Sequence, residues 1–296
     1  MDEQAVGMGG KMGTPTIGFL GVGQIGEPMV ERLLAAGHRV RLYARRPEVA
    51  DRLSAAGAQP VEKAADVGAC DVVVSCLFSD AQILDVLPGV VRAMAPHTVL
   101  VSHTTGRPGT LDRLAASAPG GNAAIVDAAF SGTADAVRAG RLVVYLGGEP
   151  GHVATARQVV GAYADPVIST GGRGSALRVK LLNNLLFAAI SQLTLGGLEA
   201  GRALGIEESA LLEALVVSSG GSTAGRYIAA RGGAEPFTAT VTPYLRKDLK
   251  ACGDVAAEAG VDLSTLLAAV HGGPMRLGDE TTRRTSRTEL FDEDHH

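Results

Sequence analysis

Short apolar runs alternate with amphipathic stretches over the first half of the chain. The apolar runs are rich in β-branched residues and predict strands at 16–22, 38–44, 70–77, 97–103, 123–130 and 141–148. Between several of them, apolar residues at helical spacing predict helices at 25–36, 47–56, 80–94 and 110–116. Nearly continuous apolar character is typical of parallel strands that are buried on both faces. The alternation therefore predicts an α/β domain with a doubly wound parallel sheet.

The pattern changes after Gly174, where strand-like runs cease and Ala/Leu-rich helical periodicity continues almost to the end. The first helix is predicted at 175–204, about 45 Å long at 1.5 Å per residue, which is long enough to join two domains. We predict an α/β domain at 15–172 and an all-helical domain at 173–281. Residues 1–14 and 282–296 are interpreted as disordered tails. The terminal His295–His296 pair is not interpreted as a metal site, and no metal is expected.

Composition narrows the class of partner. The chain has 296 residues, of which 46% are hydrophobic and 20% charged, and its net charge is −4. Its basic residues are scattered, which disfavours nucleic acid and anionic membranes as partners. Cys70, Cys76 and Cys252 form no CxxC pair, which argues against a disulfide framework and fits a cytoplasmic protein. The apolar stretch 181–198 carries amide and hydroxyl side chains and is interpreted as a buried helix, not a membrane span. The expected partner is a small molecule.

A glycine-rich motif follows the first predicted strand and opens the first predicted helix. In such a strand–turn–helix unit the first glycine permits a tight turn, the second lets a pyrophosphate approach the backbone, and the third allows close helix packing. The helix N-terminus supplies N–H groups to the phosphates. The motif predicts a Rossmann-type dinucleotide site formed by Gly21, Val22, Gly23, Gln24, Ile25 and Gly26.

The end of the second predicted strand bears on the choice between NADP and NAD. An NAD site usually places an acidic residue there for the ribose 2′-hydroxyl, whereas this chain has Ala44, Arg45 and Arg46. Two guanidinium groups suit a 2′-phosphate, so NADP is favoured and NAD is the alternative. The alternative is that Arg45 and Arg46 are solvated loop residues without a ligand, because most basic residues of the chain are arginines.

With Pro28 and Met29, the glycine motif resembles the opening signature of the β-hydroxyacid dehydrogenase family, the 3-hydroxyisobutyrate and 6-phosphogluconate dehydrogenase-like NAD(P)-binding proteins. The resemblance extends over about 16–270. It implies that Cys76 and Leu77 contact the cofactor and that Thr104 lies near the nicotinamide. The neighbouring His103 has no counterpart in the family pattern and is interpreted as a loop residue.

The segment 127–136 resembles the family's substrate-binding block. By this resemblance, Ser131 and Gly132 bind a substrate carboxylate together with Thr133, and exposed turn donors suit an anion. Thr133 and Ala136 stand where the family has glycine, so the substrate is not defined by the block.

The segment 174–184 resembles the family's catalytic block, which implies Lys180 as the proton-transfer residue and Asn184 as its partner. Four residues apart on one helix, these two side chains share a face. Lys247 resembles a late family lysine and is expected near the nicotinamide or the carboxylate, while Asp248 is expected to orient local structure. Surface lysines are the alternative explanation for both cations.

Together these residues imply an oxidoreductase that transfers a hydride between NADP(H) and a small β-hydroxyacid or its semialdehyde or keto acid. Lys180 would be the general acid and base, with a pKa lowered towards working pH by burial. One alternative is an imine reductase, a class that carries Asp or Tyr in place of the lysine. Another is a non-catalytic dinucleotide-binding scaffold. The resemblance also implies a homodimer or homotetramer.

Overall fold

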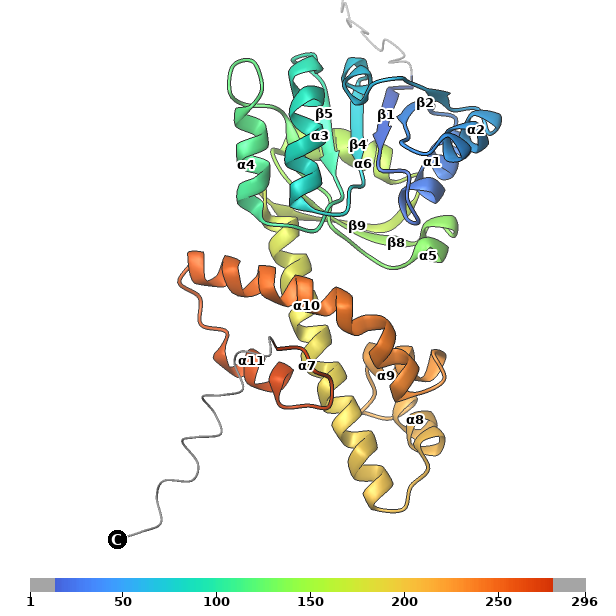
Figure 1. Cartoon of the computed structure of the whole chain (residues 1–296), viewed down its shortest axis with the longest axis vertical. Coiled ribbons are helices and arrows are strands. Elements are labelled where there is room, and N and C mark those ends of the chain that lie inside the picture. Colours follow the sequence, from blue (N-terminus) through green and yellow to red (C-terminus); the bar gives the residue numbers. More distant parts are fainter. Residues whose placement is uncertain (1–13, 279–296) are drawn as a thin grey trace, which may run out of the picture. The chain divides into compact units, whose positions relative to one another are not determined.

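The computed structural model describes residues 14–278, which form two compact units divided between Lys180 and Leu181 (Figure 1). The predicted tails, Thr14 excepted, and the His295–His296 pair lie outside the described residues.

The first unit is built on one sheet with the order β3-β2-β1-β4-β5-β6-β8-β7, and β9 pairs with β8. The pairs from β3 through β6 are all parallel. This arrangement confirms the predicted doubly wound, Rossmann-type fold. Within the described residues its strands are β1 (Thr16–Leu20), β2 (Arg39–Tyr43), β3 (Gln59–Pro60), β4 (Val72–Ser75), β5 (Val99–Ser102), β6 (Ile125–Asp127), β7 (Phe130–Ser131), β8 (Leu142–Gly147) and β9 (Ala164–Gly171).

The far edge of the sheet differs from the prediction of parallel strands throughout. The predicted strand 123–130 is two short strands, because the chain turns at Ala128 and Ala129 between β6 and β7. β8 runs antiparallel to both of them. Strand β9 was not predicted because it is an edge strand with mostly exposed residues and no apolar run. An apolar run does not by itself determine whether the strand beside it in the sheet is parallel or antiparallel.

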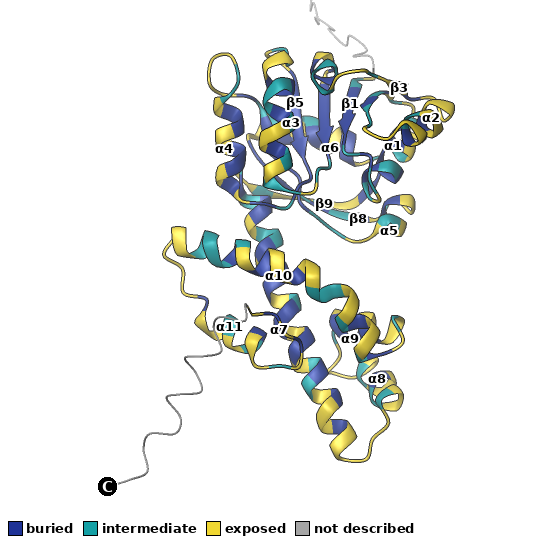
Figure 2. Cartoon of the chain, viewed as in Figure 1, coloured by how far each residue is buried: buried dark blue, intermediate teal, exposed yellow. Residues whose placement is uncertain are grey.

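Helices cover both faces of the sheet. Alternate strand residues point to opposite faces, so Val72 and Val74 pack with α1, α2 and α6 while Val73 packs with α3, α4 and the 3-10 helix η1. Figure 2 shows the central strands buried between these layers. The helices are α1 (Gly26–Ala35), α2 (Pro47–Ala55), η1 (Ala64–Ala69), α3 (Asp80–Ala93), α4 (Pro108–Ala116), α5 (Ala134–Arg138) and α6 (Pro150–Val160); η1, α5 and α6 were not predicted.

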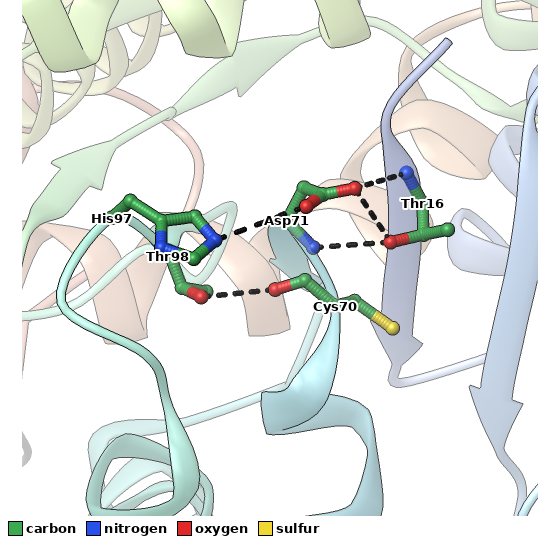
Figure 3. Close-up of polar contacts among 5 residues, drawn as sticks. All are labelled: Thr16, Cys70, Asp71, His97 and Thr98. Carbon is green, nitrogen blue, oxygen red and sulfur yellow. Dashed lines mark hydrogen bonds and ion pairs between the residues drawn. The ribbon is translucent and has the colours of Figure 1, made fainter. Parts of the chain in front are cut away.

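Polar contacts tie the amino ends of three central strands together (Figure 3). The Asp71 carboxylate accepts hydrogen bonds of 2.7 Å from both the N–H and the hydroxyl of Thr16. These bonds hold the pKa of Asp71 below its usual value. The Thr98 hydroxyl donates to the Cys70 carbonyl at 3.0 Å, and His97 lies 3.9 Å from the Asp71 carboxylate. The opposite, carboxyl edge of the sheet is where ligands bind in this fold.

The second unit is helical throughout its described residues, as predicted. It contains most of α7 (Ser175–Ala203), then α8 (Glu208–Val216), α9 (Thr223–Ala230), α10 (Ala234–Glu258) and α11 (Ser264–His271). Its core includes Leu181, Leu185 and Ala188 of α7, which recur at helical spacing. The buried Gln192 amide bonds to Met275 in both directions and to the Val270 carbonyl. By length and hydropathy α7 qualifies as a membrane span, but half of its most apolar window is buried in the protein, and core helices meet the same test.

Candidate active site

The glycine-rich turn joins β1 to α1 at the carboxyl edge of the sheet. Gly21 has φ +87°, and a side chain there would collide with the Cys76 carbonyl. A side chain on Gly26 would collide with the Gly21 carbonyl, so this glycine allows close packing of the helix on the turn. A Cβ on Gly23 would meet no protein atom within 4 Å, so this stretch of backbone is open to a ligand. The three positions therefore meet the three requirements of a pyrophosphate-binding turn.

A cavity of about 460 Å³ adjoins this turn. Seven of the predicted cofactor residues line it: Gly21, Val22, Gly23, Arg45, Arg46, Cys76 and Leu77. Six lining residues were not predicted as site residues: Leu20, Tyr43, Phe78, Gln82, Asp85 and Val86. Three of these, Gln82, Asp85 and Val86, come from α3, whose residues reach the cavity only because β4 lies beside β1. The sequence pattern does not give the order of neighbouring strands, so these residues were not predicted.

Besides Thr104, four predicted cofactor residues of the first unit do not line this cavity. Gln24 is exposed, Ile25 packs against the core, Gly26 is buried under the turn, and Ala44 packs against the core beside the arginines. These four residues are therefore not placed against the cavity.

The two arginines at the end of β2 are both exposed at the cavity but differ in their contacts. The Arg46 guanidinium donates to the Val22 carbonyl at 3.4 Å and so braces the glycine turn. Arg45 extends from the same strand end, and Glu48 belongs to the first turn of α2. The residues at the end of β2 are therefore cationic, which suits a phosphate more than a neutral hydroxyl.

The loop after β5 holds Thr104 and His103. Thr104 is 2% exposed, and its hydroxyl has no hydrogen-bond partner among the described residues, which fits a contact to a bound cofactor. His103 is a loop residue, as predicted, but it is fully buried. Its Nδ1 donates to the Ala128 carbonyl, and its Nε2 lies 2.8 Å from the Tyr163 hydroxyl. Burial lowers the pKa of His103 to about 4. The His103–Tyr163 pair joins residues 60 positions apart and had no local signal in the sequence.

The predicted substrate-binding block lies at β7 and the start of α5. Ser131 is half-buried at the end of β7, while Gly132 and Thr133 are exposed in the turn that follows. Gly132 has φ +138°, and a Cβ there would lie 2.9 Å from the Leu142 side chain. The turn is therefore exposed at Gly132 and Thr133, and hydroxyl and backbone N–H donors in an exposed turn suit a carboxylate.

Lys180 and Asn184 lie one helical turn apart on α7. Lys180 is half-buried, whereas Asn184 is 9% exposed. The Asn184 amide donates to Asp248 Oδ2 at 2.5 Å, and its oxygen accepts from Asn183 at 3.1 Å. Asp248, on α10, therefore holds Asn184 in one orientation, and the neighbouring Lys247 lies 3.7 Å from its second oxygen. Asp248 was predicted to orient local structure, and the residue that it contacts and orients is Asn184.

The turn, the cavity and the strand order define a nucleotide-dependent α/β protein. Residues 16–172 match the family model described as the NAD binding domain of 6-phosphogluconate dehydrogenase. Residues 174–273 match the model described as NAD-binding of NADP-dependent 3-hydroxyisobutyrate dehydrogenase. The chain belongs to the β-hydroxyacid dehydrogenase family, and its first unit carries a nicotinamide-dinucleotide-binding domain.

Curated relatives agree with this assignment, and a solved structure shares the fold. The chain is 30% identical to 3-hydroxyisobutyrate dehydrogenase of Pseudomonas aeruginosa over 70% of this chain and 71% of that one. It is 29% identical to the mitochondrial 3-hydroxyisobutyrate dehydrogenase of Rattus norvegicus, over 69% of this chain but only 62% of the relative's length. The structure of 3-hydroxyisobutyrate dehydrogenase of Mycobacterium tuberculosis with L-serine shares the fold, with a TM-score of 0.76, 24% identity, and coverage of 87% of this chain and 91% of that one.

Proposed function

We propose that this protein is an NADP-dependent dehydrogenase that interconverts a small β-hydroxyacid and its semialdehyde or keto acid. The observation that carries the proposal is the polar cluster on α7, where Lys180 stands one turn from an asparagine that Asp248 holds in place. Polar groups in an apolar helix are costly unless they are hydrogen-bonded. An asparagine fixed by a hydrogen bond one turn from a lysine therefore indicates a functional site. The curated relatives act on small hydroxyacids by name, which supports the same class.

Proton transfer is assigned to Lys180. When bound, the dinucleotide supplies or accepts the hydride at the substrate carbon. In the reductive direction the Lys180 ammonium gives a proton to the carbonyl oxygen as that oxygen becomes an alkoxide, and in oxidation the neutral amine takes it back. The Asn184 oxygen already accepts one hydrogen bond from Asn183 and keeps a second lone pair. That lone pair suits the Lys180 ammonium or the substrate hydroxyl.

Carboxylate binding is assigned to the turn of Ser131, Gly132 and Thr133, because Gly132 and Thr133 are exposed there. Thr133 adds a side chain where the family pattern has glycine, which favours a compact substrate. We expect turnover with 3-hydroxyisobutyrate, L-serine, glyoxylate or the semialdehydes of methylmalonate, succinate or tartronate. Lys247 is proposed to contact the cofactor or the carboxylate, and Thr104 the nicotinamide.

The preference for NADP rests on the strand end at Arg45 and Arg46, which line the cavity and place no carboxylate at the end of β2. Charge-assisted bonds from guanidinium groups favour the 2′-phosphate. Equal kcat/KM for NADPH and NADH would contradict this preference.

The test is absorbance at 340 nm with purified protein, NADPH or NADH, and the panel of small carboxylates. We expect turnover that prefers NADPH. Lys180→Ala should lower kcat by roughly 10²–10⁴, the usual contribution of a positioned acid or base. The matched control is Lys250→Ala, since Lys250 is an exposed lysine on α10. Near-normal turnover by Lys180→Ala would refute the mechanism, and oxidation of NADPH only with added amine would indicate an imine reductase.

We also propose a cytoplasmic location, from the three cysteines that form no CxxC pair, and a homodimer or homotetramer, from the family resemblance. Light scattering that gives a monomer mass at micromolar concentration would refute the oligomer.

A further inference from the structure

Helix α7 begins without a capping side chain of its own. Gly174 directly precedes the helix and has φ +87°. The first N–H groups of a helix have no partner within it and are normally satisfied by a polar side chain at this position. Glycine cannot supply one, so the start of the 29-residue α7 depends on an acceptor from elsewhere in the chain.

Asp127, the last residue of β6, is that acceptor. Its Oδ1 accepts from the Gly174 N–H at 2.7 Å, and its Oδ2 accepts from the Leu177 N–H at 3.0 Å. The carboxylate thus binds the residue before the helix and the third residue within it, as a capping side chain would. A negative charge also interacts favourably with the N-terminal end of a helix.

Burial makes a charged carboxylate energetically costly at this position. Asp127 is 0% exposed, and this burial raises its pKa, while the N–H bonds from Gly174 and Leu177 oppose the rise. A buried carboxyl group is costly unless it is well hydrogen-bonded. An apolar residue would fill the same space without that cost, so the helix N–H groups are the reason for an acid here.

The surrounding residues leave room for this contact. Gly147 of β8 pairs with Asp127, and a Cβ on Gly147 would lie 2.7 Å from Asp127 Oδ1 and 2.6 Å from the Ser175 hydroxyl. Ser175 in turn lies 2.7 Å from the Thr170 hydroxyl at the end of β9. Three strands therefore converge on the first turn of α7.

The contact joins the two segments to which the proposed function assigns substrate and proton. Asp127 precedes Ser131 by four residues, and Leu177 precedes Lys180 by three, so Leu177 and Lys180 lie on one side of the helix. We propose that Asp127 is a positioning residue for Lys180, holding the lysine helix at a fixed place relative to the carboxylate-binding turn. The assignment rests on the proposed function, since it needs Lys180 to transfer the proton.

The informative substitution is Asp127→Asn, which keeps the size of the side chain. The amide retains one acceptor oxygen but presents an NH₂ group to one of the two N–H donors, and the negative charge is lost. A displacement of order 1 Å at a reacting group can cost about 10²-fold in rate. We therefore expect kcat to fall by about 10–100-fold, with the Kd for NADPH, measured by its fluorescence, changed less than twofold.

The matched control is Asp112→Asn. Asp112 binds the Arg173 side chain at 3.0 Å, next to the start of α7, but it is an exposed partner of a side chain and not of the helix N–H groups. An exposed ion pair contributes little, so kcat should stay within twofold of wild type.

A double-mutant cycle separates positioning from general damage. In the Lys180→Ala background, Asp127→Asn should change the residual kcat less than twofold, because there is no longer a lysine to position. An equal fall in both backgrounds, or no fall in the wild-type background, would overturn the assignment. Loss of NADPH binding in Asp127→Asn would overturn it as well.

Hydrogen exchange of the peptide 171–180, measured by mass spectrometry, tests the contact of Asp127 with the first turn of α7 without an activity assay. Exchange should accelerate in Asp127→Asn and not in Asp112→Asn. If wild type shows no turnover that depends on Lys180, the proposed function fails and the positioning role falls with it, while accelerated exchange would still identify Asp127 as the cap. If turnover depends on Lys180 and Asp127→Asn leaves kcat unchanged, the positioning role alone fails.

Discussion

Buried His103 should make the stability of the protein depend on pH in a defined direction. A carbonyl can only accept, so the 2.5 Å contact to Ala128 requires a proton on Nδ1, and the neutral Nε2 accepts from the Tyr163 hydroxyl at 2.8 Å. Burial lowers the pKa of His103 from 6.5 to about 4, despite the opposing effect of the Ala128 bond. Between these values the unfolded chain binds a proton that the folded chain does not. The free energy of unfolding therefore falls as pH drops through this window.

The magnitude follows from the two pKa values. The full loss is about 3 kcal/mol, and the part lost between pH 7 and pH 5 is about 2 kcal/mol, at 1.36 kcal/mol per pKa unit. The assay is urea unfolding, followed by circular dichroism at pH 7, 6 and 5, of wild type and His103→Gln. Glutamine does not titrate, so the difference between the two proteins cancels other ionisable groups. We expect wild type to lose about 2 kcal/mol relative to the variant between pH 7 and pH 5.

Two results would refute this reasoning. One is a stability difference between wild type and His103→Gln that stays constant from pH 7 to pH 5. The other is an NMR titration of the His103 ring with a midpoint near 6.5, the value of a solvated imidazole.

Two further substitutions test other parts of the structure. Arg45→Ala should raise the KM for NADPH by about 10–100-fold, the equivalent of one charge-assisted hydrogen bond, and change the KM for NADH less than twofold; equal effects on both cofactors would contradict a 2′-phosphate contact. Gly147→Ala places a Cβ 2.6 Å from the Ser175 hydroxyl, so overpacking should lower the free energy of unfolding by about 1–3 kcal/mol. A thermal unfolding scan showing an unchanged Tm would contradict the close approach at this glycine.

Local patterns predicted most of the elements. The apolar runs for β1, β2, β4, β5 and β8 and the helix at 175–204, observed as Ser175–Ala203, were evident without tertiary information. Element type follows from side-chain periodicity, which is a property of neighbouring residues. The antiparallel direction of β8 and the existence of the exposed strand β9 were not predicted, because strand direction and edge pairing depend on residues far along the chain.

The candidate site was likewise predicted in part, where its residues are close together in the sequence. The glycine turn and the arginines after β2 were predicted, since their spacing within one strand–turn–helix unit carries the chemistry. The α3 wall of the cavity, with Gln82, Asp85 and Val86, was not predicted, because it reaches the turn only through the order of β1 and β4.

The sequence by itself determined the type of each main element, the dinucleotide-binding turn and the family. Each of these is expressed in short-range spacing, which the chain carries whether or not it is folded. Only the tertiary structure decided that Asp127 caps a helix 47 residues away and that His103 is buried against Tyr163. A hydrogen bond between distant residues leaves no periodicity in the sequence, because it depends on where the strands place their ends and on which side chains lose contact with water.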